Sequence, residues 1–448
     1  MAVTLRTSSL IYRELVDKPS EWRSNMRSKI AVVWIVSILL ACYSCVAAER
    51  IPGPLESLAR TALHGNPAES AEATASLRQA GPAGMEAALA LAGSPKDTEA
   101  LDRVCGVRDC ADIRLFWYTD LEAAKAAAKA SGKPILSLRL LGRLDEEFSC
   151  ANSRFFRTVF YKNRDINALL RDRFILHWHS LRPVPRVTID FGDGSRLERT
   201  LTGNSIHYVL DSRGRLVQPL PGLYGPAAFQ KALEEAARAV RTANRLDDIG
   251  FEQWQTLRIE EQLRAVGAPF RLNLRALPTP PDDGAPGAVL SWSELLKNNP
   301  DLRSAAMSKQ AVEAPILSAF DLTANDDQLN DIARLRRPRV HLDPASRDFL
   351  LLKQGIKTPD EAARVLAAFE ATVALDEVIN EYRTGPAILR KLMAPETRKD
   401  FELEEFNQWV YAEVFRAPLS DPWLGLAPGD LYGALPAATR TAGPGPRR

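Results

Sequence analysis

Residues 113–243 alternate between helical patterns and short apolar runs, and this alternation limits the fold more than any other feature of the sequence. Residues 121–131 predict a helix, because a capping box precedes them and Gly132 is placed to end them. Residues 134–141 predict a strand. Helices expected over 155–160 and 165–171 then lead to a second strand over 174–179.

Two hairpins and a closing helix complete this region. A glycine-rich turn at 191–195 joins the alternating runs 187–190 and 196–201, and a second turn at 211–214 joins 206–210 to 216–219. Residues 226–240 predict a helix with proline in its first turn. The order predicts an α/β domain, a mixed sheet with helices packed on both faces. We expect nine apolar side chains in its interior: Leu136, Leu138, Leu140, Phe155, Phe156, Ile175, Trp178, Val209 and Leu223.

Five segments in this order resemble the thioredoxin-like superfamily, in its exported bacterial branch. The resemblance covers residues 113–243. Its five segments are 117–124, 132–136, Cys150, which opens a helix one loop after the strand, 174–176 and 208–214. It implies a thioredoxin fold. Oxidoreductases of that superfamily carry Cys-x-x-Cys at the helix start and a cis-proline before the fourth strand. Here those positions hold Cys150-Ala-Asn-Ser153 and Ser205.

Cys150 and Ser153 are the candidate catalytic residues. A thiol at a helix N-terminus meets unpaired N–H donors and the positive end of the helix dipole, which favour the thiolate. Ser153 can hydrogen-bond that thiolate, but without a second cysteine Cys150 cannot release a mixed disulfide by itself. The position predicts a thiol exposed enough to be alkylated rapidly. The alternative is a buried small side chain that remains from an ancestral site.

Three functions stay open from the sequence. The favoured one is an exported, non-enzymatic protein-binding or assembly module with a degenerate site, whose unknown protein partner contacts the C-terminal helical domain. The second is a periplasmic thiol-disulfide oxidoreductase that acts through Cys150, with Cys105 or Cys110 as resolving thiol. The third is a metal- or heme-handling periplasmic protein. His177 and His179 share a strand face but show no third ligand, so no metal or cofactor site is predicted.

Residues 1–48 predict export to the periplasm or to a membrane-anchored position facing it. A short positive segment after Met26, the preferred start, precedes the apolar residues 30–41. Small residues then suit cleavage before Glu49, whereas 39–42 resemble a lipobox that would lipidate Cys42 and make the chain a lipoprotein. A retained membrane tether over 30–48 is the third alternative. Disulfides persist in the compartment that all three imply.

The flanking regions predict mainly helical structure. Residues 49–112 form a helical lead-in closed by Cys105 and Cys110, which we expect to form a disulfide, with two reduced thiols as the alternative. Residues 244–448 form a mainly helical C-terminal domain with a Pro-rich linker over 277–288, and helical runs are expected near 293–297, 304–320, 344–354, 359–379 and 398–415. Its aromatic segment 409–426 predicts a packed arm or, alternatively, a groove for a partner. A net charge of +2 gives no electrostatic reason to expect nucleic-acid binding.

Overall fold

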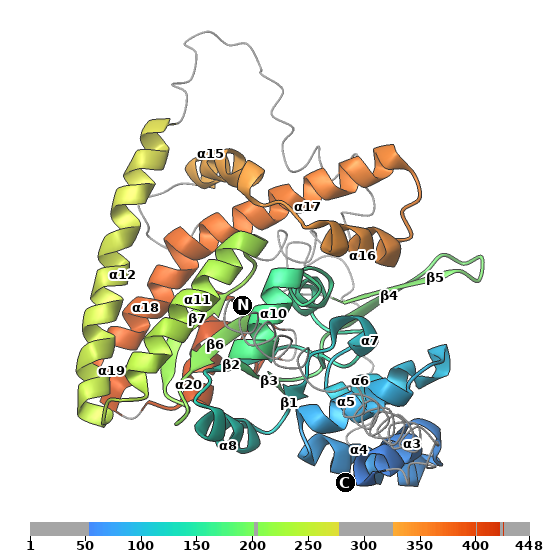
Figure 1. Ribbon diagram of the computed structural model, residues 1–448. Coiled ribbons are helices and arrows are strands. Elements are labelled where there is room, and N and C mark those ends of the chain that lie inside the picture. The colour runs from blue at the N-terminus through green and yellow to red at the C-terminus, as the bar shows by residue number, and fades with distance from the viewer. Residues whose placement is uncertain (1–52, 201–204, 277–325, 400, 422–423, 425–448) are drawn as a thin grey trace, which may run out of the picture. The chain divides into compact units, whose positions relative to one another are not determined.

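A five-stranded mixed sheet lies among helices in the computed structural model (Figure 1). Its strand order is β1 (Trp117–Tyr118), β3 (Ile175–Ser180), β2 (Ile135–Leu140), β6 (Ile206–Leu210) and β7 (Leu216–Pro221). The first three strands are parallel, and β6 and β7 are antiparallel to their neighbours. The α/β class with a mixed sheet is therefore as the sequence predicts.

The structure describes residues 53–200, 205–276, 326–399, 401–421 and 424. From Leu58 onward this part of the chain belongs to one compact unit. The export segment 1–48, the linker 277–288, the helical runs near 293–297 and 304–320 and the end of the segment 409–426 lie outside the described residues, so the predictions made for them keep that status.

Short helices precede the sheet, and a disulfide closes them as predicted. They are α3 (Pro54–His64), α4 (Pro67–Gln79), α5 (Pro82–Leu91), the 3-10 turn η1 (Pro95–Asp97), α6 (Thr98–Cys105) and α7 (Cys110–Ile113). Asn66 caps α4 through a capping box, and Gly106 ends α6 in the left-handed conformation that glycine adopts without strain. Cys105 is bonded to Cys110, and both are buried.

The helices between β1 and β3 follow the prediction except in one turn. They are α8 (Leu121–Ser131), α9 (Ala151–Phe155) and α10 (Arg164–Arg173). The chain after α9 is not α-helical but forms the π-helical turn η2 (Phe156–Phe160). This wider turn holds the rings of Phe156 and Phe160 in a stack, with centroids 5.4 Å apart.

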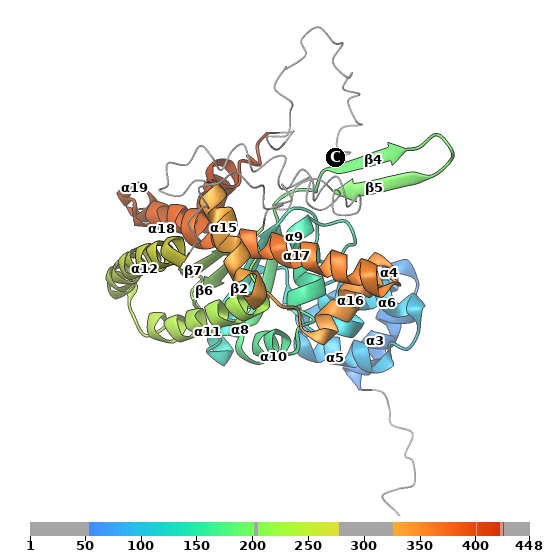
Figure 2. The ribbon, with the colours of Figure 1, turned by 90° about the horizontal axis from the view of Figure 1, so that it is seen from above.

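Both predicted hairpins are present. Strands β4 (Arg186–Asp190) and β5 (Arg196–Thr200) form a separate two-stranded sheet that projects away from the main sheet (Figure 2). Strands β6 and β7 form the second hairpin, and β7 is an edge strand of the main sheet. Helix α11 (Pro226–Ala243) follows it, as expected.

The remaining described residues are almost entirely helical. The helices are α12 (Asp248–Ala276), α15 (Asp326–Arg336), α16 (Pro344–Gln354), α17 (Pro359–Ile379), α18 (Gly385–Met393), α19 (Pro395–Lys399) and α20 (Leu403–Trp409), with the 3-10 turn η3 (Arg337–Arg339) and the π-helical turns η4 (Asn380–Thr384) and η5 (Val410–Val414). The boundaries of α16 and α17 are those expected from sequence. The single helix expected over 398–415 is instead divided among α19, α20 and η5.

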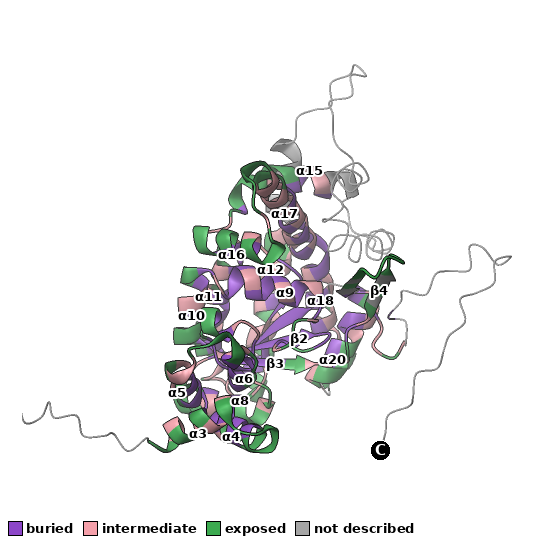
Figure 3. Cartoon of the chain, turned by 90° about the vertical axis from the view of Figure 1, so that its right-hand side faces the viewer, coloured by how far each residue is buried: buried purple, intermediate pink, exposed green. Residues whose placement is uncertain are grey.

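Alternation along the strands gives the sheet two chemically different faces. The apolar face carries Leu136, Leu138, Trp178, Val209 and His207, and it packs against η2 and α11. The polar face carries Ser137, Arg139, His177 and Tyr208, and it packs against α20 and η5. Both faces are covered, so β2 is buried along its whole length and β3 is buried at residues 176–178 (Figure 3). Of the nine predicted interior residues all are buried except Ile175, which is half-buried.

Candidate functional site

Cys150 lies where β2 leads into α9, as the sequence predicts, but its thiol is not accessible. It is the N-cap residue of α9, and its N–H donates to Leu141 O at 3.0 Å. Its Sγ lies 3.3 Å from Ser153 Oγ, while the Ser153 hydroxyl donates to Cys150 O at 2.8 Å. The exposed fraction of Cys150 is 0%. The expectation of an exposed thiol is therefore wrong, because tertiary packing covers this helix start.

Two tyrosines from distant parts of the chain lie close to the thiol. Burial raises the pKa of Tyr161 and of Tyr411, and the neighbouring Cys150 raises both further. Tyr161 Oη is 3.0 Å from His207 Nε2, and the Tyr411 hydroxyl donates to Arg139 O at 3.3 Å. Cys150 is thus fully buried, and the hydroxyls of Tyr161 and Tyr411 lie within electrostatic range of its thiol.

The residues around the cysteine have contacts of their own. Ser205, at the position expected for the cis-proline, is buried, and its carbonyl accepts the Gly222 N–H at 3.0 Å. Arg154 donates to Thr200 Oγ1 at 2.9 Å. Arg157 is buried, and burial lowers its pKa. Among the described residues Cys150 is the one free cysteine, because Cys105 and Cys110 are bonded to each other.

A buried hydrogen-bond network fills the polar face of the sheet. Arg139 donates from Nη1 to Ser137 Oγ at 2.5 Å, and Ser137 Oγ lies 2.7 Å from His177 Nδ1. Because arginine is a donor only, Ser137 Oγ accepts from Arg139, and its remaining hydrogen and lone pair let it either donate to or accept from His177 Nδ1, according to the tautomer of the ring. Arg139 also forms an ion pair with Glu404 of α20, through Nη2 at 2.5 Å and Nε at 3.3 Å.

His177 belongs to this network, whereas His179, two positions later on the same strand face, is exposed. Burial, with Arg139 as a further cause, lowers the pKa of His177 to about 3, so its ring is neutral at pH 7. Burial and Arg139 also lower the pKa of His179. The parts of the chain that the structure describes contain no group of three His, Cys, Asp or Glu side chains placed to hold a metal ion.

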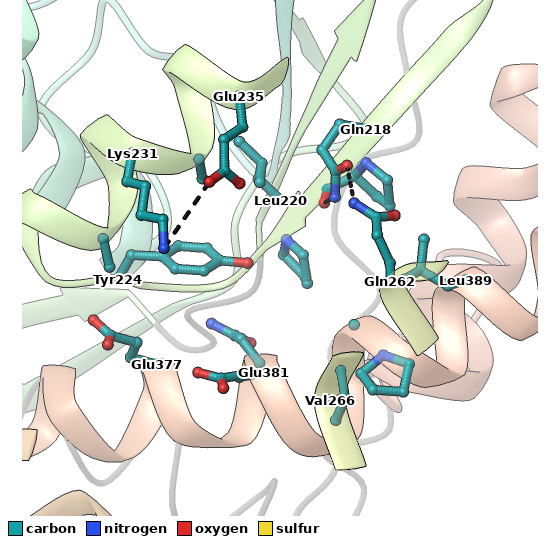
Figure 4. Close-up of a pocket in the computed structure, with 17 residues that line it drawn as sticks. Gln218, Leu220, Tyr224, Lys231, Glu235, Gln262, Val266, Glu377, Glu381 and Leu389 are labelled. Atoms are coloured by element: carbon teal, nitrogen blue, oxygen red, sulfur yellow. Dashed lines mark hydrogen bonds and ion pairs between the residues drawn. The ribbon is translucent and has the colours of Figure 1, made fainter. Parts of the chain in front are cut away.

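A pocket of about 300 Å³ lies at the edge of the sheet, beside β7 (Figure 4). Its walls come from β7, α11, α12, α17, η4 and α18. The lining is mainly apolar at Leu220, Val266, Pro386 and Leu389. The polar lining is formed by Gln218, Tyr224, Lys231, Glu235, Gln262, Glu377, Asn380 and Glu381. The volume is at the lower end of the range for small-molecule sites.

Two carboxylates reach the pocket from one helix face. Glu377 and Glu381 are four residues apart, and Figure 4 shows them opposite Tyr224 and Lys231 of the other wall. Glu377 accepts the Gly225 N–H at 2.8 Å, and burial raises its pKa. Arg336 forms an ion pair with Glu377 at 3.6 Å and a closer one with Glu381.

No sequence motif marks this pocket, since its residues come from segments up to 171 positions apart, Gln218 to Leu389. The i, i+4 spacing of Glu377 and Glu381 was the one local signal, and many solvated helix faces have it.

No helix among the described residues is long and apolar enough to cross a membrane. No protein-family model matches the chain, and no curated protein is similar enough to it to count as a match.

Proposed function

We propose that residues 113–243 form a thioredoxin-like domain. The strand order β1-β3-β2-β6-β7, with three parallel strands followed by two antiparallel ones, supports this proposal. So does the start of α9 at a cysteine directly after the loop that follows β2. The hairpin β4–β5 is then an insertion between the third and fourth strands of the domain.

The domain serves as a protein-binding or assembly module and not as a dithiol oxidoreductase. The burial of Cys150 is the observation that carries this proposal. Thiol–disulfide exchange needs a thiolate that can reach a disulfide sulfur in line, and then a second thiol to release the mixed disulfide. Ser153 stands in the resolving position, and Cys105 and Cys110 are joined to each other.

The helical C-terminal region supplies the surface for a protein partner. Five large hydrophobic side chains of the described residues are exposed, and four of them follow residue 243: Ile249, Leu257, Leu335 and Leu352. The side of α20 and η5 that carries Phe406, Tyr411 and Val414 is buried. A partner therefore contacts the outward surfaces of α12, α15 and α16.

Export to the periplasm completes the proposal. It rests on the apolar segment near the N-terminus and on the Cys105–Cys110 disulfide, which an oxidising compartment maintains. Intact mass of the protein from a periplasmic fraction tests it, with a chain that starts at Glu49 or at a lipidated Cys42 as the expected result. Unprocessed chain in the cytoplasmic fraction would contradict it.

A reductase assay tests the proposed lack of redox turnover. The full chain is compared with Cys150→Ala and Ser153→Cys for the reduction of a protein disulfide by dithiothreitol. We expect no acceleration by any of the three proteins, since even a restored Cys-x-x-Cys would remain covered by Tyr411. Sustained Cys150-dependent acceleration by the unaltered chain would overturn the proposal in favour of an oxidoreductase. Activity gained by Ser153→Cys alone would show that the site is open.

A further inference from the structure

We propose that the pocket beside β7 binds a small organic cation, with an ammonium or guanidinium head and a short apolar tail. The site does not use Cys150, so this inference is independent of the redox question. Four observations on the pocket lining support it: its two mostly buried carboxylates, its hydrogen-bond acceptors, the orientation of a buried amide and its apolar wall.

Two mostly buried carboxylates lie in the interior of the pocket and share one arginine as their ion-pair partner. Glu377 and Glu381 are mostly buried, with side-chain exposures of 13% and 34%, and one guanidinium, that of Arg336, contacts both. Lys231 and Glu235 lie 3.9 Å apart with side-chain exposures of 77% and 53%, so this pair forms the mouth and is neutral as a unit. Arg339 acts on Glu377 from farther away, and the Arg258 guanidinium is bonded to Gln218, so the cation is favoured by the two carboxylates that face the pocket and not by its net charge.

A chain of hydrogen bonds fixes an unsatisfied acceptor in the lining. Arg258 donates from Nη2 to Gln218 Oε1 at 2.6 Å, which identifies that atom as oxygen because arginine cannot accept. The atom of Gln262 that lies 2.8 Å from the same oxygen must then be its Nε2. Gln262 Oε1 is therefore an acceptor, and it is buried without a hydrogen-bond partner. An N–H donor on a ligand would satisfy it.

The edge strand adds acceptors but few donors. Pro219 and Pro221 line the pocket and have no backbone N–H, so at these two residues β7 offers only carbonyl oxygens, of which that of Pro219 already accepts from Gln218 Nε2 at 3.2 Å. Farther along the strand, Arg258 already donates to Val217 O at 2.8 Å. Together with the two carboxylates, this edge favours a ligand whose head carries several N–H groups and no acceptor.

The rest of the wall suits a short hydrocarbon tail. Leu220, Val266 and Leu389 are apolar, and Tyr224 places an aromatic ring beside the carboxylates (Figure 4). Aromatic faces attract ammonium and guanidinium groups in addition to their apolar contact. An anionic ligand would instead meet Glu377 and Glu381 without a free donor of matching charge.

Calorimetric titration of the full chain tests the inference with three probes of similar length. n-Butylguanidinium, 1-pentanol and pentanoate differ in charge but little in size. We expect the cation to bind with a Kd of about 1 mM or tighter, as small, well-matched ligands do, and the alcohol and the anion to bind at least about tenfold more weakly. Equal affinity for the cation and the alcohol, or no binding of the cation, would overturn the proposal.

Three variants locate the site. Glu381→Gln should weaken n-butylguanidinium binding about tenfold or more, whereas Glu252→Gln makes the same change on the exposed surface of α12 and should leave it unchanged. Ala232→Phe fills the pocket from α11 without changing its charge and should abolish binding. Thermal unfolding of each protein shows that it is folded. If both Glu381→Gln and Ala232→Phe bind as the unaltered chain does, the cation binds elsewhere and the proposal is wrong.

Discussion

The two faces of the central sheet are buried by helices from different parts of the chain. On the apolar face the ring centroids of Phe156 of η2 and His207 are 4.5 Å apart, and the ring of Phe229 of α11 stacks on that of Phe160 with centroids 4.1 Å apart. All of these residues lie within the same stretch of chain as the strands. On the polar face Arg139 of β2 pairs with Glu404 of α20, 265 positions later.

This difference shows how a strand can carry polar residues inward. Transferring Arg139 and His177 out of water is unfavourable unless each finds hydrogen-bond partners. Ser137, Glu404 and Tyr411 are partners of that network, and two of them come from the last part of the described chain. The C-terminal helices are therefore a structural component of the sheet, and they also cover Cys150.

The largest expected effect lies on the apolar face. Phe156→Ala removes a fully buried ring that contacts Phe160, Tyr161 and His207, and it should lower the free energy of unfolding by about 3–5 kcal/mol. Chemical denaturation measures this loss. Phe191→Ala, at an exposed turn, is the matched control and should change stability by less than about 0.5 kcal/mol. A loss below about 1 kcal/mol for Phe156→Ala would mean that this face is not the core.

Removing the carboxylate of Glu404, which pairs with Arg139, tests whether α20 closes the polar face. Glu404→Gln leaves the fully buried Arg139 guanidinium without its carboxylate, and Glu404 is itself 52% exposed, so solvent compensates in part. We expect a loss of about 2–3 kcal/mol, less than for a fully buried pair. Glu405→Gln, on the exposed side of the same helix, should be nearly neutral. Equal effects of the two variants would show that α20 does not close this face.

Acid should destabilise both faces through their histidines. The pKa values of His177 and His207 in the folded chain are about 3, below the ordinary value of 6.5, and burial is the main cause for both. Protons therefore bind the unfolded chain first, and stability present above pH 6.5 is lost as the pH falls toward 3. Between pH 6.5 and pH 5 each histidine should lower the free energy of unfolding by about 2 kcal/mol.

Variants assign this acid effect to each face. His177→Asn and His207→Asn should each reduce the stability difference between pH 7 and pH 5 by about 2 kcal/mol relative to the unaltered chain. If only His207→Asn reduced this stability difference, the polar face would be open to water. That result would contradict closure by α20 and η5.

The apolar face could be predicted from sequence because its signals are local. Alternation marked Leu136, Leu138 and Leu140 as interior, and the turn at Asp211–Gly214 marked the β6–β7 hairpin, both of which the structure confirms. The burial of Cys150 could not be predicted in this way. It depends on packing between segments that are far apart in the sequence, and contacts of this kind, such as that of Tyr411 with β2, have no signature in the residues around either partner.

The pocket was not predictable for the same physical reason. Glu377 and Glu381 have the spacing of an ordinary solvated helix face, and only the packing of α17 and α18 near β7 makes them line a cavity. His177 and His179 show the converse. Their spacing gave them a shared face, but the identity of that face as a buried network required a segment from the other end of the chain.

Alkylation of Cys150 in the folded protein tests closure of the polar face most directly. The full chain is treated with iodoacetamide at neutral pH with and without denaturant, and peptide mass spectrometry follows Cys150 separately from the other cysteines. Burial by η2 and η5 predicts that Cys150 in the folded chain reacts at least about 100-fold more slowly than in the unfolded chain. Tyr411→Ala should recover much of that rate. Alkylation of folded Cys150 as fast as a simple thiol would contradict the account.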